Sequence, residues 1–162
     1  MARQKLVLPT CLGLAICDAV ITDVQTRNKS LINMFNGILT PAVPARHDRM
    51  CVYVAFTGGR GRLPIALRLC HDAEYEKDLL PRMGDDVEFP MNNPHAVVDI
   101  VFDIRGFVFP RFGNYTFEIL CDEVPLIARR FTVQRANAPG QPATTSEPSP
   151  PEEPPPGFDP PG

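Results

Sequence analysis

Apolar and polar residues alternate along three stretches between residues 95 and 133. In the first, apolar residues occupy every second position and acids fall between them: Ala96, Val98, Ile100, Phe102 and Ile104, with Asp99 and Asp103. The second places these residues on one face: Tyr115, Phe117, Ile119 and Cys121. Successive side chains of a β-strand point to opposite faces, so this period of two predicts half-buried strands. In the third, residues 126–133, neither face is purely apolar.

Short turn sequences separate these stretches. Asp122 and Glu123 lie between the second and third, and this spacing predicts a tight hairpin. Gly113 stands two residues before Tyr115, at the point where the second stretch begins. In immunoglobulin-like sandwiches a tyrosine at this corner bonds through its hydroxyl to backbone upstream. The alternative is an ordinary turn followed by a strand that happens to begin with tyrosine.

Earlier apolar runs predict the remaining strands. Residues 12–24 predict one long strand, or two with a bulge. Residues 31–39 predict a second strand, in which Asn36-Gly37 is either a turn or a bulge. Residues 49–56 and 62–70 predict a hairpin closed by the glycine-rich turn at 57–61. Turn signals recur about every 8–12 residues, which is typical of a sandwich. The sequence therefore predicts an all-β fold, an immunoglobulin-like antiparallel β-sandwich of about 7–9 strands.

Two local features add to this pattern. Pro64 lacks a backbone N–H, which predicts that its strand lies at a sheet edge or over a bulge. Residues 72–77 precede Pro81 and have the composition of a single helical turn.

The composition changes after Val133. The following segment is rich in Pro, Glu, Ser, Thr and Gly, and it cannot bury enough apolar surface to offset its conformational entropy. We therefore predict an N-terminal arm (residues 1–10), a β-sandwich domain (residues 11–136) and a disordered Pro/Glu-rich tail (residues 137–162). PxxP spacings in the tail suit aromatic peptide-binding grooves; the other interpretation is an inert solvating extension.

Charge and cysteine usage exclude several function classes. The 162 residues carry 16 basic and 19 acidic side chains, a net charge of -3, which gives no footprint for nucleic acid. The apolar N-terminal run is interrupted by Pro9 and is too short for a membrane helix. The cysteines match no metal-binding spacing, and we interpret them as reduced and structural: Cys11, Cys17, Cys51, Cys70 and Cys121. We therefore expect no nucleic-acid or membrane partner and a cytoplasmic location.

Several of these residues together resemble a known family. They are Cys17-Asp18 with Asp23, Phe35-Asn36-Gly37, Pro44, Gly113-x-Tyr115-x-Phe117 and Phe131-x-Val133. Over residues 10–134 the chain resembles a widespread bacterial family of small single-domain β-sandwich proteins of unknown function. The resemblance implies a compact sandwich and a bacterial source, and it implies no activity.

The search for chemistry identifies no catalytic, cofactor-binding or metal-binding constellation. His47-Asp48 and His71-Asp72 are adjacent pairs, which point to opposite faces in a strand, so we expect solvated loop histidines. Cys51 or Cys70 with a distant histidine leaves a cysteine-dependent enzyme as a third hypothesis.

Two groups of residues are candidate binding sites. Arg60 and Arg62, in the turn at residues 58–62, are candidate anion contacts, although the turn lacks the lysine and the helix of a nucleotide-binding loop. Phe107, Phe109 and Phe112 either plug one end of the sandwich or form an exposed protein interface.

The leading hypothesis is a non-enzymatic cytoplasmic interaction or assembly module that uses no cofactor. The alternative is a small-molecule or phosphate-binding domain that uses the turn from Gly58 to Arg62. The partner we expect is another protein, of a kind that the sequence does not specify, and the sequence does not specify an oligomeric state.

Overall fold

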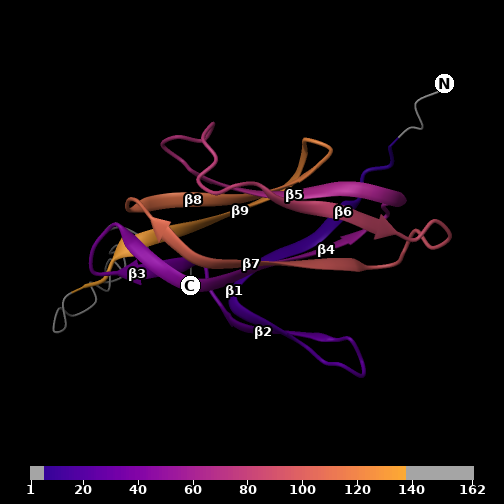
Figure 1. Ribbon diagram of the computed structural model, residues 1–162, viewed down its shortest axis with the longest axis horizontal. Coiled ribbons are helices and arrows are strands. Elements are labelled where there is room, and N and C mark those ends of the chain that lie inside the picture. Colours follow the sequence, from indigo (N-terminus) through magenta and orange to yellow (C-terminus); the bar gives the residue numbers. More distant parts are fainter. Residues whose placement is uncertain (1–5, 138–162) are drawn as a thin grey trace, which may run out of the picture.

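The computed structural model describes residues 6–137; the predicted tail, beyond residue 137, lies outside the described residues. The strands are β1 (Thr10–Thr22), β2 (Lys29–Met34), β3 (Gly37–Thr40), β4 (Ala45–Thr57), β5 (Gly61–His71), β6 (Met83–Phe89), β7 (Val98–Phe109), β8 (Gly113–Cys121) and β9 (Val124–Arg135). They form a four-stranded sheet of order β2-β1-β4-β7 and a five-stranded sheet of order β3-β9-β8-β5-β6, packed face to face (Figure 1). The predicted all-β sandwich is confirmed.

The strand order is that of an immunoglobulin-like domain. Strands β1, β4 and β7 are neighbours in one sheet, and β9, β8 and β5 are neighbours in the other. This corresponds to the A-B-E and G-F-C orders of the immunoglobulin sandwich. All pairs are antiparallel except β3 and β9, which run parallel. Within residues 6–137 no helix is long and apolar enough to cross a membrane.

The core lies between the two sheets and is built from alternate residues of the strands. β4 contributes Met50, Val52, Val54 and Phe56, β5 contributes Leu63, Ile65, Leu67 and Leu69, and β8 contributes Tyr115, Phe117, Ile119 and Cys121. Each fully buried aliphatic or aromatic side chain stabilises the fold by roughly 1.5–3 kcal/mol. The five cysteines are free, so this core forms without a disulfide.

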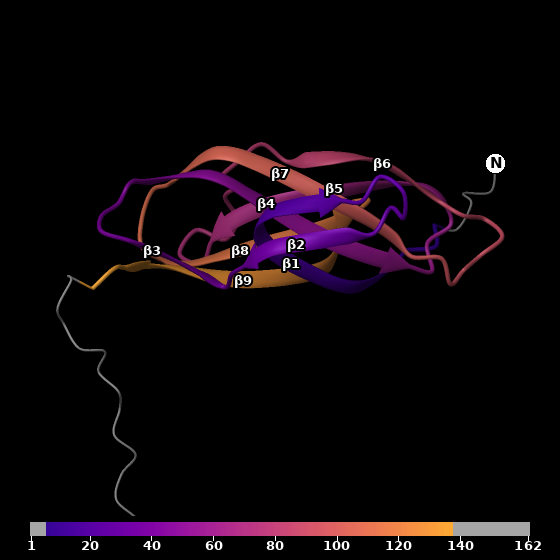
Figure 2. The same ribbon diagram turned by 90° about the horizontal axis from the view of Figure 1, so that it is seen from below.

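The hairpin of β1 and β2 forms a third layer on the outer face of the four-stranded sheet. β1 pairs with β4 as far as Cys17, and from there to Thr22 it pairs with β2 instead. Lys29 at the start of β2 reaches back to Asp99 of β7, with 2.6 Å between Nζ and Oδ1. In Figures 1 and 2 the hairpin crosses the outer side of the sheet. Cys17 and Cys51 are buried at the place where β1 leaves β4, although neither belongs to the core between the sheets, and the Cys51 Sγ lies 3.9 Å from the Asp18 carbonyl oxygen.

Two predicted strand arrangements are wrong. Residues 31–39 are not one strand, because β2 ends at Met34 and β3 begins at Gly37 in the other sheet. Residues 57–61 do not close a hairpin, because β4 and β5 belong to different sheets. Glycine-rich turns serve equally for a hairpin and for a crossing between sheets, and strand periodicity does not distinguish them.

The predictions for Pro64 and for the helical turn are also wrong. β5 lies inside its sheet between β8 and β6, and its ladder with β8 begins only at Ile65. The Pro64 carbonyl accepts a hydrogen bond from the Asp122 N–H at 3.1 Å, so this residue lies where β8 has already turned away. Residues 72–77 form successive turns, with the Glu74 N–H donating to the His71 carbonyl at 2.9 Å.

Candidate functional site

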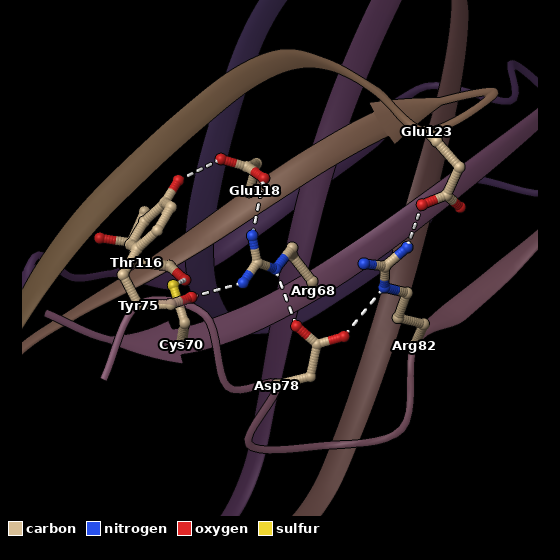
Figure 3. Close-up of polar contacts among 8 residues, drawn as sticks. All are labelled: Arg68, Cys70, Tyr75, Asp78, Arg82, Thr116, Glu118 and Glu123. Atoms are coloured by element: carbon tan, nitrogen blue, oxygen red, sulfur yellow. Dashed lines mark hydrogen bonds and ion pairs between the residues drawn. The ribbon is translucent and has the colours of Figure 1, made fainter.

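A strap, the β5–β6 connection at residues 72–82, lies over the outer face of the five-stranded sheet. A polar network centred on Arg68 of β5 holds it there (Figure 3). The Arg68 Nε donates to Asp78 Oδ1 at 2.8 Å, and Nη2 donates to the Tyr75 carbonyl at 2.6 Å. Its Nη1 lies 3.3 Å from Glu118 Oε1 of β8. The Arg68 and Glu118 side chains are only 11% and 7% exposed.

Strand alternation places this pair on the outer face. Leu67 and Leu69 point into the core, so Arg68 between them points outward. Arg68 and Glu118 are direct partners in the β5–β8 register. Oppositely charged residues that face each other across strands attract. The sequence showed both charges and the strand alternation that turns Arg68 outward, but it carried no signal that the strap would cover them.

The strap residues complete the network. The Tyr75 hydroxyl donates to Glu118 Oε2 at 2.5 Å, and this hydrogen bond, together with burial and the carboxylate charge, raises the pKa of Tyr75 to about 12. Arg82 bridges Asp78 and Glu123, at 2.9 and 2.5 Å. Burial raises the pKa of Asp78, but hydrogen bonds from both arginines outweigh it and hold this pKa below its usual value. The network therefore fixes the strap to the sheet through matched charges.

A shallow polar depression lies beside the strap, lined by Asp72, Tyr75, Thr116, Ala128 and Arg130. The Thr116 hydroxyl donates to Asp72 Oδ1 at 3.1 Å, and Arg130 Nη2 lies 3.1 Å from Asp72 Oδ2. The carboxylate and the guanidinium of this depression therefore neutralise each other.

His71 corrects the prediction that the histidines are solvated. Its side chain is buried at the end of β5, packed against the ring of Tyr115. Its Nδ1 accepts the Ala73 N–H at 3.0 Å, which places the proton on Nε2, 3.1 Å from the Phe112 carbonyl. Both ring nitrogens are thus used structurally. Among residues 6–137, no three His, Cys, Asp or Glu side chains are placed to hold a metal ion.

The two candidate anion contacts line one shallow depression, together with Leu6, Val7 and Met91. Arg62 on β5 pairs with Asp86 of β6, with 3.1 Å between Nε and Oδ2. Arg60 is exposed in the loop that crosses between the sheets. One of the two positive charges is therefore already neutralised, and anion binding stays a prediction.

The three phenylalanines do not form one exposed surface. Phe109 is fully buried and packs edge-to-face on Tyr115 and Phe131. Phe107 is half-buried against Phe109, with ring centroids 4.8 Å apart, and Phe112 is half-buried beneath the Arg135 guanidinium. The interface prediction is wrong for Phe109, because the chain turns this residue into the core.

An exposed apolar face lies instead on the β1–β2 hairpin. Ile21, Ile32 and Met34 are 58%, 44% and 57% exposed. Ala19 pairs with Ile32, and Cys17 pairs with Met34, so alternation places the three exposed side chains on one face of the ribbon. β2 is the last strand of its sheet, so one of its main-chain edges has no partner among the described strands. The sequence predicted these strands, but not which face would point outward.

These features define a small immunoglobulin-like sandwich domain with a strapped sheet and a projecting apolar hairpin. The chain belongs to DUF6941, a family of unknown function, whose family model matches residues 12–134. That range includes nearly all of the strand residues from β1 to β9. No curated protein matches the chain.

Proposed function

We propose that the protein is a non-enzymatic interaction or assembly module that binds another protein through the outer face of the β1–β2 hairpin. The observation that carries this proposal is the exposure of Ile21, Ile32 and Met34 on one face of an edge ribbon. Exposed apolar residues that are scattered singly need no explanation, but a contiguous group with polar surroundings is typical of a protein interface.

The way the hairpin is held supports this role. Lys29 of β2 pairs with Asp99 of β7 at 2.6 Å and so ties the hairpin to the sheet. The Tyr53 hydroxyl of β4 donates to the other oxygen of the same carboxylate at 3.1 Å. Asn33 donates to Asp18 across the two strands at 2.5 Å. A face that is already ordered loses little conformational entropy when it binds.

The bacterial source and the cytoplasmic location are part of the same proposal. The source rests on the resemblance of the sequence to a bacterial family. The location rests on the five free cysteines, because proteins of the reducing cytoplasm rarely form disulfides.

The test replaces the apolar face and keeps the strand propensity. The variant Ile21→Thr/Ile32→Thr/Met34→Thr is compared with the wild type and with a control of three other exposed apolar residues, Leu39→Thr/Met91→Thr/Val97→Thr. Tagged proteins are cross-linked in a host lysate after their thermal midpoints have been shown to agree. We expect one partner that the wild type and the control capture and the hairpin variant loses. Identical capture by all three would contradict the proposal.

A further inference from the structure

Two cysteines lie opposite each other across β1 and β4, on the outer side of the four-stranded sheet. Cys17 and Cys51 are direct partners in the antiparallel register of these strands. Ile16 and Met50, the residues that precede them, belong to the core between the sheets. Since successive side chains of a strand alternate, both cysteine side chains point to the outer face. The strand pairing therefore holds two thiols side by side in the folded protein.

The spacing of the two strands suits a disulfide. Directly opposite residues of an antiparallel ladder have Cα atoms roughly 4.5–5.5 Å apart. A disulfide requires a Cα separation of roughly 4.4–6.8 Å. The Cys17 Sγ lies 3.4 Å from the Ala19 carbonyl oxygen, and the Cys51 Sγ lies 3.9 Å from the Asp18 carbonyl oxygen. Both sulfurs thus lie against the same short segment of β1, and a bond between them can form without moving the strands.

The other three cysteines have no cysteine opposite them in the strand register. Cys70 pairs with Thr116 across β5 and β8. Burial, and then the charge of Cys121, raise the pKa of Cys11, so these two thiols are near each other. They belong to different sheets, however, and no ladder fixes their separation. Within residues 6–137 no third His, Cys, Asp or Glu side chain is placed to complete a metal site with Cys17 and its partner.

We propose that Cys17 and Cys51 are a redox pair, which a peroxide converts from two thiols into a cross-strand disulfide. One thiolate attacks a peroxide oxygen, the O–O bond breaks, and a sulfenic acid forms as hydroxide leaves. The second thiolate then attacks this sulfur, the S–O bond breaks, and a second hydroxide leaves. The two protons that the thiols release convert both hydroxides to water. The sulfurs lose two electrons, and the peroxide gains them.

The oxidant reaches the pair at the end of a ladder. β1 pairs with β4 as far as Cys17 and then departs to pair with β2. The end of a ladder opens more readily than its middle. Both thiols are buried in the closed form, and burial is the main cause that raises the pKa of Cys17 and of Cys51. The closed pair therefore reacts slowly, and its oxidation depends on this opening.

The bond would also act on the fold around it. It would close a loop from residue 17 to residue 51, which contains β2 and the part of β1 that pairs with it. A cross-link of this kind restricts the unfolded chain and so stabilises the folded one. It would fix the point where β1 leaves β4, which is the base of the hairpin. The redox pair does not rest on the function proposed for the hairpin face.

Peptide mapping of the full-length protein tests the proposal. The reduced wild type is treated with hydrogen peroxide under native conditions, the remaining thiols are blocked with N-ethylmaleimide, and linked peptides are identified by mass spectrometry. Cys51→Ala is the test variant. Cys70→Ala is the matched control, because Cys70 is equally buried but lies opposite a threonine. Thermal midpoints confirm that both variants are folded, and the wild-type map does not depend on either.

We expect a linked Cys17–Cys51 peptide as the principal cross-link in the wild type and in Cys70→Ala, and no such peptide in Cys51→Ala. The thermal midpoint should rise in the two proteins that form the bond, and dithiothreitol should return it to the value of the reduced protein. Cys51→Ala should show no rise that dithiothreitol reverses.

Three outcomes would overturn the proposal. The first is a wild type in which Cys17 and Cys51 stay unlinked after treatment, as thiols or as irreversibly oxidised acids. The second is a link that forms only in denaturant, where the strand register no longer holds the two sulfurs together. The third is a principal cross-link between Cys11 and Cys121, which would assign the redox pair to the space between the sheets.

Discussion

The Tyr115 hydroxyl donates a hydrogen bond to the backbone carbonyl of Arg111 at 2.6 Å, and the Arg111 N–H approaches the same oxygen at 3.3 Å. The ring is fully buried and stacks against Phe131 in the core. One side chain thus joins β8 to the connection that carries the chain over from β7. This is the tyrosine corner of an immunoglobulin-like sandwich, and its prediction from the sequence is confirmed.

Tyr115→Phe should destabilise the domain, because the ring stays buried and only the hydrogen bond is lost. A hydrogen bond of this kind contributes about 0.5–1.5 kcal/mol net, and the loss is larger when a buried partner is left unsatisfied. Gly113→Val should cost more, because Gly113 has a φ of 122° and an added Cβ would lie 2.8 Å from His71 Nε2. Denaturant unfolding of both variants measures these costs. Two neutral substitutions would show that the corner does not stabilise the domain.

The corner could be predicted because its signal is local. Gly113 and Tyr115 lie at the boundary between two alternating stretches, and no distant residue is needed to define the turn. The β8–β9 hairpin is predictable for the same reason: Asp122 and Glu123 both have positive φ values, 48° and 63°, as a tight two-residue turn requires.

The arrangement of the earlier strands could not be predicted, because alternation specifies a face and not a sheet. The residues at Asn36 and at Gly58–Gly61 have turn chemistry that suits a hairpin, yet both connections cross between sheets. The burial of Arg68 and Glu118 depends on the strap, which has little periodicity. The hairpin face depends on β1 leaving β4 near Cys17, and no feature of the local sequence specifies that departure.

Arg68→Met should destabilise the domain by about 3 kcal/mol, because it leaves the Glu118 carboxylate buried and without its cation. Arg82→Met removes an arginine whose partner Glu123 is 75% exposed, so this matched control should have a much smaller effect. The double variant Arg68→Met/Glu118→Leu should recover part of the loss. Denaturant unfolding gives the free energies, and limited proteolysis within residues 72–82 reports release of the strap. Equal effects of Arg68→Met and Arg82→Met would contradict the central role of Arg68.

Stability should fall in acid through Asp78 and Asp103. Burial raises the pKa of both carboxylates, but hydrogen bonds from arginines outweigh it and lower each pKa below the ordinary 3.8. Asp78 accepts these bonds from Arg82 and Arg68, and Asp103 accepts them from Arg49 and Arg105. A carboxylate whose pKa is lowered by folding stabilises the fold fully above its unfolded pKa and loses that effect as the pH falls through the folded pKa. The denaturant midpoint should therefore drop below about pH 4. The Asp78→Asn variant should show a smaller fall of the midpoint in acid than the wild type. A variant whose midpoint falls as steeply as that of the wild type would contradict the role of Asp78.

The five cysteines should be unreactive in the folded protein and free after unfolding. Burial is the largest cause that raises the pKa of every one of these thiols, and that of Cys11 reaches about 11. Since the thiolate is the reactive form, thiol titration should be slow under native conditions. Titration in denaturant without a reductant should then detect five thiols. Fewer than five would reveal a disulfide and contradict the reduced state.

Gly84→Ala should weaken the attachment of β6. Gly84 pairs with Ala66 of β5, and an added Cβ would lie 2.7 Å from the Ile65 carbonyl oxygen and 3.2 Å from the Ala66 Cα. These are backbone and close-packed atoms that cannot rotate away, so the strand itself must move, at a cost of about 1–3 kcal/mol. Gly13→Ala is the matched control, because no atom lies within 4 Å of its added Cβ.

The control should be neutral or should stabilise the fold by up to about 1 kcal/mol, since alanine restricts the unfolded chain more than glycine does. Denaturant unfolding of both variants measures the difference, and amide exchange at residues 83–89 shows whether the loss is confined to β6. If Gly84→Ala is as well tolerated as Gly13→Ala, then β6 can shift on β5 without cost. The close approach at Gly84 would then contribute nothing to the attachment of β6.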